Sequence, residues 1–319
     1  MYQYFDYCLN LAQKYYCKTN PQVGAVIVYN GKIIASGYHR GPGSNHAEIE
    51  ALANLKQKIN PEMAMFVSLE PCNHVGKTNP CTHAIIQSGI KNVFYAVSDN
   101  NPDVSGAGHA YLKQNGVNAS HINHRSSYLF YQPYLRWNKH RKPWFHLKQA
   151  QTINNVIGIE NERLFITGHQ ANAWTMRERL KSDALVVSAR TILTDDPKLT
   201  VRMDGKELLK PLIVIGRNLD MSNFSQYKNR PIHLIVNIDD LEATCIKHNY
   251  RQLLVECGAE MGSLLIQKRI INQISILRST KTIKNEGAIF GITPSDRAFN
   301  KVSLTSLGND YLESYFSTI

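Results

Sequence analysis

HAEIEAL at residues 46–52 and PCNHVGKTNPC at residues 71–81 are the two stretches that decide how the first half of the chain folds. A hydrolytic zinc site takes three protein ligands and leaves a fourth position open for water, and imidazole and thiolate groups are suitable ligands. His46, Cys72 and Cys81 supply this set. Glu48 is then a general acid and base that passes a proton from the activated water to a leaving amine. The two stretches therefore predict a zinc centre that activates water.

The spacing of these residues restricts where they lie. Side chains two residues apart in the middle of a helix point in nearly opposite directions, so His46 must precede a helix and Glu48 must lie in its first turn. Asn45 is a favourable residue type for the N-cap of that helix. We expect Cys72 to end a strand and Cys81 to begin a helix, whose positive N-terminal end favours a thiolate.

The loop between the two cysteines is unusually long. Zinc deaminases carry H-x-E followed by P-C-x-x-C, in which the glutamate is not a ligand. Here the cysteines enclose eight residues, among them His74, Lys77 and Thr78, and we expect these three to contact a phosphate or sugar of the substrate. The alternative is that they are solvated loop residues. For the ligands, the alternative is a loop histidine bonded to the backbone and two buried thiols.

The composition suits a two-domain protein. A chain of 319 residues with 43% hydrophobic residues can bury a core in each of two domains. The N-terminal residues do not resemble a secretory signal and no apolar run reaches about 18 residues, so we expect a cytoplasmic protein without a membrane partner. Six cysteines are too few for a disulfide scaffold. The net charge of +11 favours phosphorylated metabolites, a dinucleotide or nucleic acid as partners.

The first half alternates helical and extended patterns. Residues 2–16 have a helical apolar period, and Asn30-Gly31 is the turn that most favours a hairpin. The other expected elements are strands 23–29 and 32–38, a helix with Ala51, Leu52, Leu55 and Ile59 on one face that Pro61 ends, strand 63–69, helix 82–87, strand 92–97, another helix, and a strand near Val117. This order predicts a three-layer α/β domain.

The composition changes between Tyr131 and Pro143, where basic and aromatic residues gather without periodicity. We place a domain boundary near Pro143, which gives domains of residues 1–143 and 144–319. Apolar runs of strand length then recur at 145–150, 184–188, 212–215, 232–236, 253–256 and 274–277, with helical segments at 170–180 and 260–268. This alternation predicts a second α/β domain with a largely parallel sheet.

Motifs in both halves resemble those of one family. In the first half they are PCxHxGxTxPC at residues 71–81, NPQVG at 20–24 and GYH at 37–39. In the second half they are TILTDDPKLTVR at residues 191–202 and VECG at 255–258. These motifs are similar to those of the bifunctional riboflavin-biosynthesis deaminase/reductase family, so the resemblance covers nearly the whole chain.

The resemblance implies a cytidine-deaminase-like first domain and a dihydrofolate-reductase-like second domain. Residues 1–143 would remove, with Zn²⁺, the exocyclic amine of a diaminopyrimidinone that bears a phosphoribosylamino group. Residues 144–319 would then reduce the ribosyl group to a ribityl chain with NADPH. The resemblance also implies a homodimer formed through the reductase domain, and it argues against nucleic acid as a partner.

The same resemblance assigns roles in the second half. It implies cofactor contacts at Ala150, Thr191, Asp195 and Gly258, and substrate contacts at Arg179, Leu199, Arg202 and Glu256. A glycine before a helix, as at Gly258, leaves backbone N–H groups for a phosphate. Arg179 and Arg202 suit a bidentate grip on a phosphate. Without the resemblance, Gly258 would simply separate a strand from a helix and each arginine would be a surface charge.

Two further hypotheses remain open. Asn154 and Asn155 stand where the family has Asp-Gly, and Arg163 and Phe165 stand where it has Ser and Trp. Such a turn is expected to close less well over nicotinamide, so the second half could be a degenerate reductase kept for dimerisation and stability. The charge of +11 and the basic, aromatic stretch 131–142 motivate the other alternative, a base deaminase that acts on nucleic acid.

Overall fold

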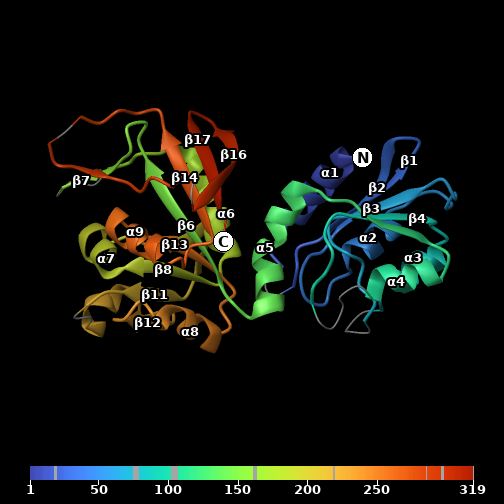
Figure 1. Ribbon diagram of the computed structural model, residues 1–319, viewed down its shortest axis with the longest axis horizontal. Helices are drawn as coiled ribbons and strands as arrows, with labels where there is room; N and C mark the ends of the chain where they lie inside the picture. The colour runs from blue at the N-terminus through green and yellow to red at the C-terminus, as the bar shows by residue number, and fades with distance from the viewer. Residues whose placement is uncertain are drawn as a thin grey trace. The chain divides into compact units, whose positions relative to one another are not determined.

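The computed structural model describes residues 1–17, 20–74, 79–101, 107–160, 164–217, 220–284, 286–295 and 298–318, without the side chains of 221–223. The chain forms two compact units, Met1–Arg141 and Lys142–Ile319, and each is described here by itself (Figure 1). Within the described residues, no helix combines the length and the apolar character needed to cross a membrane.

A five-stranded mixed sheet forms the centre of the first unit. Its strand order is β2-β1-β3-β4-β5. The strands are β1 (Gly24–Tyr29), β2 (Lys32–Tyr38), β3 (Ala64–Val67), β4 (Asn92–Tyr95) and β5 (Asn118–His121). β1 is antiparallel to β2 and β3, whereas β3, β4 and β5 are parallel. Asn30 and Gly31 take φ values of 47° and 72°, as the expected two-residue hairpin turn requires.

Helices cover both faces of this sheet (Figure 1). They are α1 (Tyr2–Ala12), α2 (Ala47–Ala53), α3 (Cys81–Ser88), α4 (Ala107–Gln114) and α5 (Arg125–His140). Side chains alternate along β1, so that Ala25 and Ile27 pack with buried residues of α2, α3 and α4. Val26 and Val28 pack on the other face with residues of α1 and α5. The three-layer α/β arrangement expected from the sequence is confirmed.

The helix expected to run up to Pro61 is much shorter, and that prediction is wrong. α2 ends at Ala53, with Asn54 as its C-cap. Leu55 and Ile59 nevertheless pack against the same core from non-helical backbone. Apolar spacing shows which residues are buried, but it does not distinguish a helix from a loop that returns to the same core.

The basic, aromatic stretch near the end of the first unit showed no periodicity in the sequence, yet it is helical. It belongs to α5, a 16-residue helix that contains Pro133. Only Ser127, Tyr131 and Trp137 of this helix are buried. Tyrosine and tryptophan carry both apolar and polar parts, so the buried stripe is poorly visible in the sequence.

The second unit is built on an eight-stranded sheet with the order β12-β11-β8-β13-β6-β14-β17-β16. The strands are β6 (Trp144–Gln151), β8 (Ala184–Ser188), β11 (Leu212–Ile215), β12 (Ile232–Ile235), β13 (Gln252–Glu256), β14 (Gln273–Ser279), β16 (Phe299–Leu307) and β17 (Asp310–Ser317). All pairs from β12 to β14 are parallel, and the C-terminal hairpin is antiparallel. The largely parallel sheet is confirmed.

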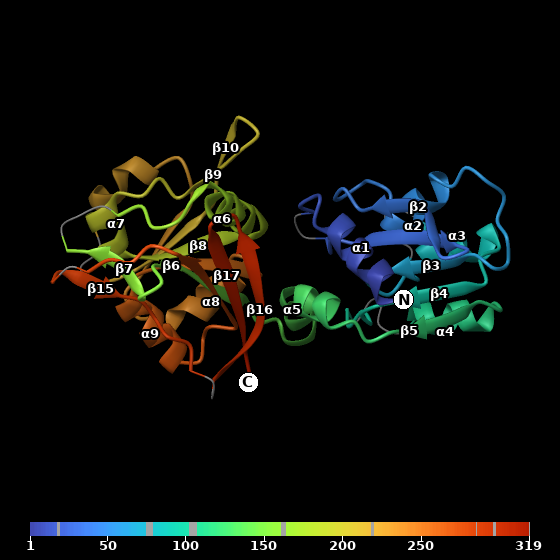
Figure 2. The same cartoon turned by 90° about the horizontal axis from the view of Figure 1, so that it is seen from above.

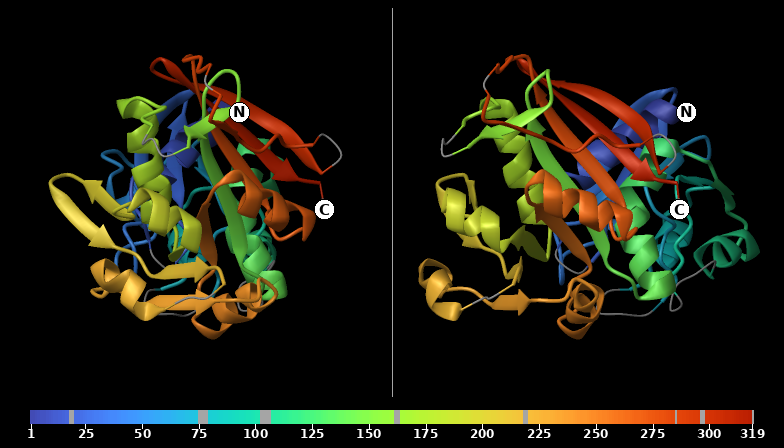
Figure 3. Two further views of the ribbon diagram at one scale, coloured as in Figure 1. Left: turned by 90° about the vertical axis from the view of Figure 1, so that its left-hand side faces the viewer. Right: turned by 60° about the vertical axis from the view of Figure 1, so that its left-hand side comes forward.

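Helices flank the central strands of this sheet (Figure 3). They are α6 (His169–Lys181), α7 (Ala189–Asp195), α8 (Asp240–Lys247) and α9 (Ala259–Gln267). Every residue of β8 and of β11 is buried, as expected for parallel strands covered on both faces. One core packs against α8 and α9, a second packs against α7 and the 3₁₀ segment Met221–Tyr227, and a small third cluster includes Ala171 of α6.

Several elements of the second unit had no clear pattern in the sequence. β16 was not expected, because most of its side chains are exposed and polar. β9 (Thr200–Met203) and β10 (Lys206–Leu209) form a separate hairpin, which projects from the body of the unit in Figure 2. β7 (Val156–Ile159) and β15 (Ala288–Phe290) form another small sheet. Short exposed strands bury too few side chains to produce a recognisable period.

Candidate active sites

The three expected metal ligands lie together in the first unit. The ligand atoms of His46, Cys72 and Cys81 all lie within 4.8 Å of one another. Nδ1 of His46 is 3.2 Å from Sγ of Cys81 and 3.4 Å from Sγ of Cys72. One imidazole and two thiolates make a donor set that fits a catalytic zinc ion with one open position.

The N-termini of two helices, α2 and α3, position two of these ligands. His46 is itself the N-cap of α2, with extended backbone, and Glu48 follows in the first turn. The expectation that Asn45 is the cap is therefore wrong, and its carbonyl instead accepts a hydrogen bond from His39 Nδ1 at 3.0 Å. Cys81 begins α3, as expected. β3 already ends at Val67, so Cys72 lies in the following loop rather than at the end of a strand.

Local hydrogen bonds bring the cysteine loop back to the start of α3. The backbone N–H of Cys81 donates to Cys72 Sγ at 3.5 Å, and the backbone N–H of Thr82 donates to the Cys72 carbonyl at 3.2 Å. The hydrogen bond between the two thiols lowers the pKa of Cys72 and raises that of Cys81. The pair therefore readily supplies a thiolate, which is the form that binds a metal.

Glu48 is buried beside this cluster, with 3% of its surface exposed. Burial, followed by the neighbouring Cys72, raises the pKa of its carboxyl to about 7. A cation held by the ligands opposes this rise. A carboxyl that exchanges its proton near neutral pH is suited to general acid and base catalysis.

Buried residues behind the ligands fix their orientation. The His39 ring stands at 75° to the His46 ring with 5.2 Å between centroids, and His39 Nε2 lies 3.1 Å from Asn20 Nδ2. A Cβ at Gly37 would lie 2.3 Å from the carbonyl oxygen of Ala47, so glycine lets β2 pack directly against α2. These contacts involve residues of the NPQVG and GYH motifs noted in the sequence.

Glu70 supports the other side of the site, and sequence reasoning did not single it out. Its Oε1 accepts the backbone N–H of His109 at 3.0 Å, and its Oε2 accepts that of Asp99 at 3.2 Å. Tyr134 in turn donates to both carboxylate oxygens of Asp99. The only sequence signal was the position of Glu70 directly before Pro71-Cys72.

The expected substrate contacts of the cysteine loop are only partly described. His74 is exposed. Lys77 and Thr78 lie outside the described residues.

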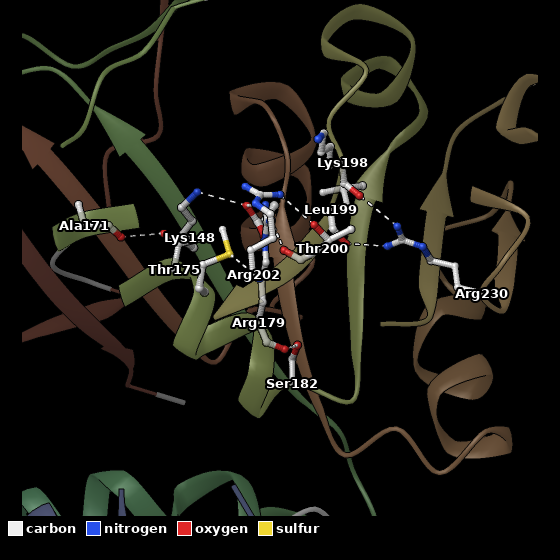
Figure 4. A network of polar contacts seen from close by, with 12 residues as sticks. Lys148, Ala171, Thr175, Arg179, Ser182, Lys198, Leu199, Thr200, Arg202 and Arg230 are labelled. Atoms are coloured by element: carbon white, nitrogen blue, oxygen red, sulfur yellow. Dashed lines mark hydrogen bonds and ion pairs between the residues drawn. The ribbon is translucent and has the colours of Figure 1, made fainter. Parts of the chain in front are cut away.

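The second candidate site lies where β6, α6, β9 and the end of β13 meet (Figure 4). Glu256 binds Arg179 through two hydrogen bonds, Nε to Oε1 at 2.5 Å and Nη2 to Oε2 at 3.0 Å. Lys148 Nζ donates to Oε2 at 3.2 Å. Burial alone would raise the pKa of Glu256, but the cations of Lys148 and Arg179 outweigh it and lower the pKa to about 2.

The guanidinium of Arg179 therefore donates its hydrogen bonds to other groups of the protein. Besides binding Glu256, its Nη1 donates to the Thr200 carbonyl at 2.9 Å. The sequence suggested that Arg179 grips a substrate phosphate, but in this structure the two-bond fork faces Glu256. Arg202 is exposed and donates to Thr200 Oγ1 at 2.8 Å, which leaves it better placed to meet a phosphate. Lys148 was missed because a single polar residue in an apolar run gives no signal of its own.

The loop before β9 has unusual backbone geometry. Asp196 and Leu199 take φ values of 38° and 49°, in the left-handed region. For residues with a Cβ this conformation costs roughly 1–2 kcal/mol each. Leu199 is buried against α7, whose N-cap Ser188 accepts the backbone N–H of Thr191 at 3.1 Å. The surrounding contacts must therefore hold the loop in place.

Other expected cofactor positions lie on the neighbouring elements. Gly258 is the N-cap of α9, and a Cβ added there would meet nothing within 4 Å. The first turn of α9 thus presents backbone N–H groups at an open position, which suits a phosphate. Ala150 is half-buried in β6, and Asp195 is the last residue of α7.

The turn that departs from the family pattern is well formed. Asn155 has φ 65°, a conformation that asparagine tolerates better than other residues with a side chain. Its Oδ1 accepts a bond from Arg278 at 2.6 Å, and Asn154 Nδ2 donates to the Ile283 carbonyl at 2.7 Å. Phe165 is 73% exposed, and Arg163 lies outside the described residues. The loss of Asp-Gly has not disrupted this turn.

Models of two known protein families match the two halves of the chain. Residues 2–97 match the model of the cytidine and deoxycytidylate deaminase zinc-binding region, and residues 143–312 match that of the RibD C-terminal domain. The fold and the site thus define a zinc-binding deaminase joined to a reductase domain. The chain belongs to the RibD family of riboflavin biosynthesis proteins.

Relatives of known sequence and structure support this membership. The chain is 32% identical to riboflavin biosynthesis protein RibD of Aquifex aeolicus over 269 residues, covering 82% of this chain and 75% of the relative. It is 31% identical to RibD of Buchnera aphidicola, covering 88% and 87%. The Thermotoga maritima deaminase/reductase structure has a similar fold, with a TM-score of 0.80 at 23% identity over 99% of this chain and 98% of that one. The chain is accordingly a bifunctional deaminase and reductase of riboflavin biosynthesis.

Proposed function

We propose that residues 1–143 hydrolyse the exocyclic amine of a diaminopyrimidinone that carries a phosphoribosylamino group. The observation that carries this proposal is the buried carboxyl of Glu48 beside three converging metal-ligating groups. Zinc held by His46, Cys72 and Cys81 supplies Lewis-acid activation of a water molecule when it is bound. The three loop residues between the cysteines, His74, Lys77 and Thr78, are proposed to contact the phosphoribosyl part of the substrate.

Glu48 moves the proton in this reaction. It accepts a proton from water as the water oxygen bonds to the ring carbon, and it donates that proton to the amine, which leaves as ammonia. Burial raises the pKa of this carboxyl and a bound cation opposes that rise, so the carboxylate form that accepts the proton is favoured when zinc is bound. The burial of Glu48 also limits exchange of this proton with bulk solvent.

We further propose that residues 144–319 bind NADPH, which supplies a hydride to the ribosyl carbon of the deaminated product and converts it to a ribityl chain. The open N-terminus of α9 after Gly258 is proposed to hold a cofactor phosphate. Ala150, Thr191 and Asp195 are the other proposed cofactor contacts.

The substrate phosphate is assigned to the exposed Arg202. Lys148, within β6, and Glu256, the last residue of β13, form a charged pair in the same site. Leu199 provides a buried apolar contact at the start of the same hairpin. Arg179 is proposed to act on the substrate mainly by holding Glu256 and Thr200.

The test is a coupled assay on the purified whole chain, following ammonia release and NADPH oxidation together. Glu48→Ala should abolish ammonia release while zinc, measured by elemental analysis, stays bound. NADPH oxidation should persist when the deaminated pyrimidine is supplied. Glu50→Ala is the matched control, because Glu50 lies on the same helix but pairs with Arg40. Retained deamination in the Glu48 variant would sink the assignment.

The same assay separates an active reductase from a degenerate one. If the wild-type chain binds NADPH but does not oxidise it in the presence of deaminated pyrimidine, the second unit has only a structural role. The well-formed turn at Asn154 and Asn155 favours an active reductase.

We also propose that the chain forms a homodimer through the second unit. β16 is an edge strand of nine residues with mostly exposed side chains, and Leu304 on it is 60% exposed. Unpaired strand edges invite pairing with another chain. Light scattering after size exclusion should show a dimer, and Leu304→Lys should shift it toward monomer; a monomeric wild type contradicts this proposal.

A further inference from the structure

The loop that enters β9 is bound by a segment that belongs to none of the motifs recognised in the sequence. Arg230 donates from Nη2 to the Lys198 carbonyl at 3.0 Å and from Nη1 to the Leu199 carbonyl at 2.6 Å (Figure 4). Tyr227 OH donates to the Pro197 carbonyl at 2.5 Å. Two side chains three residues apart thus bind three consecutive carbonyl groups of the loop.

These two side chains are themselves fixed in the unit. Tyr227 is 3% exposed and packs in the core formed by α7, β8 and β11. The Arg230 guanidinium lies 5.3 Å from the centre of the Tyr227 ring, and the Arg230 N–H donates to the Tyr227 carbonyl at 3.2 Å. The loop is therefore held by a buried tyrosine and by a half-buried arginine that packs over its ring.

A second arginine holds the loop from its other side. Arg179 donates to the carbonyl of Thr200 at 2.9 Å, directly after the two carbonyls that Arg230 binds. Between these contacts Leu199 takes its left-handed conformation. Three consecutive carbonyls thus point at two guanidinium groups from different elements, which is possible only because the backbone turns at Leu199.

This geometry determines where Arg202 lies. Arg202 follows Leu199 by three residues, and its guanidinium binds Thr200 Oγ1 at 2.8 Å. If Leu199 relaxed to an ordinary backbone conformation, the direction of β9 and the position of Arg202 would both change.

We propose that Arg230 and Tyr227 are positioning residues of the reductase, which hold the loop at residues 197–199 so that Arg202 is presented to the substrate phosphate. This inference rests on the proposed function of the second unit. Neither side chain needs to touch the substrate. Their loss should weaken substrate binding more than it slows the hydride step, because Lys148 and Glu256 are held by other contacts.

The test compares Arg230→Met with Lys228→Met in the whole chain. Lys228 is exposed in the same segment, so its variant removes the same charge without removing the hydrogen bonds from Arg230 to the loop. Arg230→Met should raise the reductase KM for the deaminated pyrimidine about tenfold while kcat falls less than about twofold. Arg230→Lys, which keeps a cationic donor, should show a smaller rise in KM. Lys228→Met should leave both constants unchanged, and deaminase activity in every variant reports on the integrity of the other unit.

Tyr227→Phe gives a second test that keeps the ring in the core. It should raise KM about threefold, whereas Tyr250→Phe, which removes a hydroxyl bonded to His233 instead, should not. An unchanged KM in both Arg230→Met and Tyr227→Phe overturns the proposal. So does an equal rise in Lys228→Met, because that would reflect charge alone.

Amide hydrogen exchange separates this inference from the proposed function. Exchange at residues 198–203 should accelerate in Arg230→Met and not in Lys228→Met, whether or not the chain oxidises NADPH. Unchanged exchange at these residues in Arg230→Met overturns the proposal that Arg230 holds the loop. A wild-type chain that does not oxidise NADPH contradicts only the reductase assignment, since the loop measurement still decides the role of Arg230.

Discussion

Arg179 and Glu256 form a two-bond ion pair that joins α6 to the end of β13, with side chains only 10% and 11% exposed. The same arginine binds the backbone of β9, and the same glutamate binds Lys148 on β6. Four elements of the second unit therefore meet at one buried pair of charges. Removal of one partner leaves the other charged and buried, which is much more costly than the loss of an exposed pair.

Arg179→Met should destabilise the second unit by about 3–5 kcal/mol, because among the described residues Glu256 would keep only Lys148 as a cationic partner. Urea unfolding followed by tryptophan fluorescence measures this, since Trp144 and Trp174 lie in the second unit. Lys301→Met is the control: it breaks an ion pair with Glu313 in which the lysine is 44% exposed, and should cost less than about 1 kcal/mol. Equal effects in the two variants would contradict a buried, structural pair.

Cys72→Ser should remove zinc from the first unit, because a hydroxyl is a far poorer ligand than a thiolate. Elemental analysis should show bound zinc falling to less than roughly a tenth of the wild-type amount. Cys245→Ser, in the core of the second unit, should retain zinc. Treatment with a chelator should likewise abolish ammonia release and spare NADPH oxidation; loss of both activities would argue against two independent sites.

Gly37→Ala should impair the zinc site although Gly37 is not a ligand. The new Cβ would lie 2.3 Å from the Ala47 carbonyl oxygen and 2.4 Å from the backbone nitrogen of Ala51, and these backbone atoms of α2 cannot move aside without shifting His46. Zinc affinity and deaminase rate should both fall. Gly158→Ala is the matched control, because its nearest neighbour is 3.9 Å away. A Gly37 variant with normal zinc affinity would show that α2 adjusts without moving its N-cap.

The second unit should lose stability on mild acidification through His146. Burial lowers the pKa of this histidine to about 4, while the unfolded value is near 6.5. Below pH 6.5 the unfolded chain takes up a proton that the folded chain does not, so stability is present above pH 6.5 and declines as the pH falls toward 4. Between pH 7 and 5 the loss is about 2 kcal/mol.

His146→Gln should flatten this pH dependence, because glutamine does not titrate. The control is His248→Gln on the exposed end of α8, which should keep the wild-type slope. Denaturant unfolding at pH 7, 6 and 5 measures the three proteins. The prediction fails if the wild-type and His146 variant lose stability in parallel.

Asn155→Ala should be more harmful than Asn155→Gly. Both substitutions remove the hydrogen bond from Arg278, but only alanine must also be forced into the left-handed conformation at φ 65°. The alanine variant should therefore be about 1 kcal/mol less stable than the glycine variant. Thermal unfolding compares the two, and an NADPH titration shows whether the turn also affects cofactor affinity. Equal stabilities would mean that the turn relaxes.

Features that depend on short segments of the chain could be predicted from the sequence. The ligand types of the zinc centre, the placement of Glu48 in the first turn after His46, and the Asn30-Gly31 hairpin follow from chemistry and spacing within short segments. The parallel core of the second unit was also visible, because strands covered on both faces are continuously apolar. Helix α5 was not visible, because its buried stripe is made of residues with polar ends.

Contacts between side chains far apart in the sequence became known from the folded structure alone. Lys148 reaches Glu256 across 108 positions because β6 and β13 are neighbours in the sheet, and Arg179 reaches it from α6 across 77 positions. Arg230 reaches the Leu199 carbonyl across 31 positions. This contact is the basis of the role proposed for a segment that carries no recognised motif. Strand order and backbone direction choose such partners, and neither is encoded in the spacing of residues along one segment.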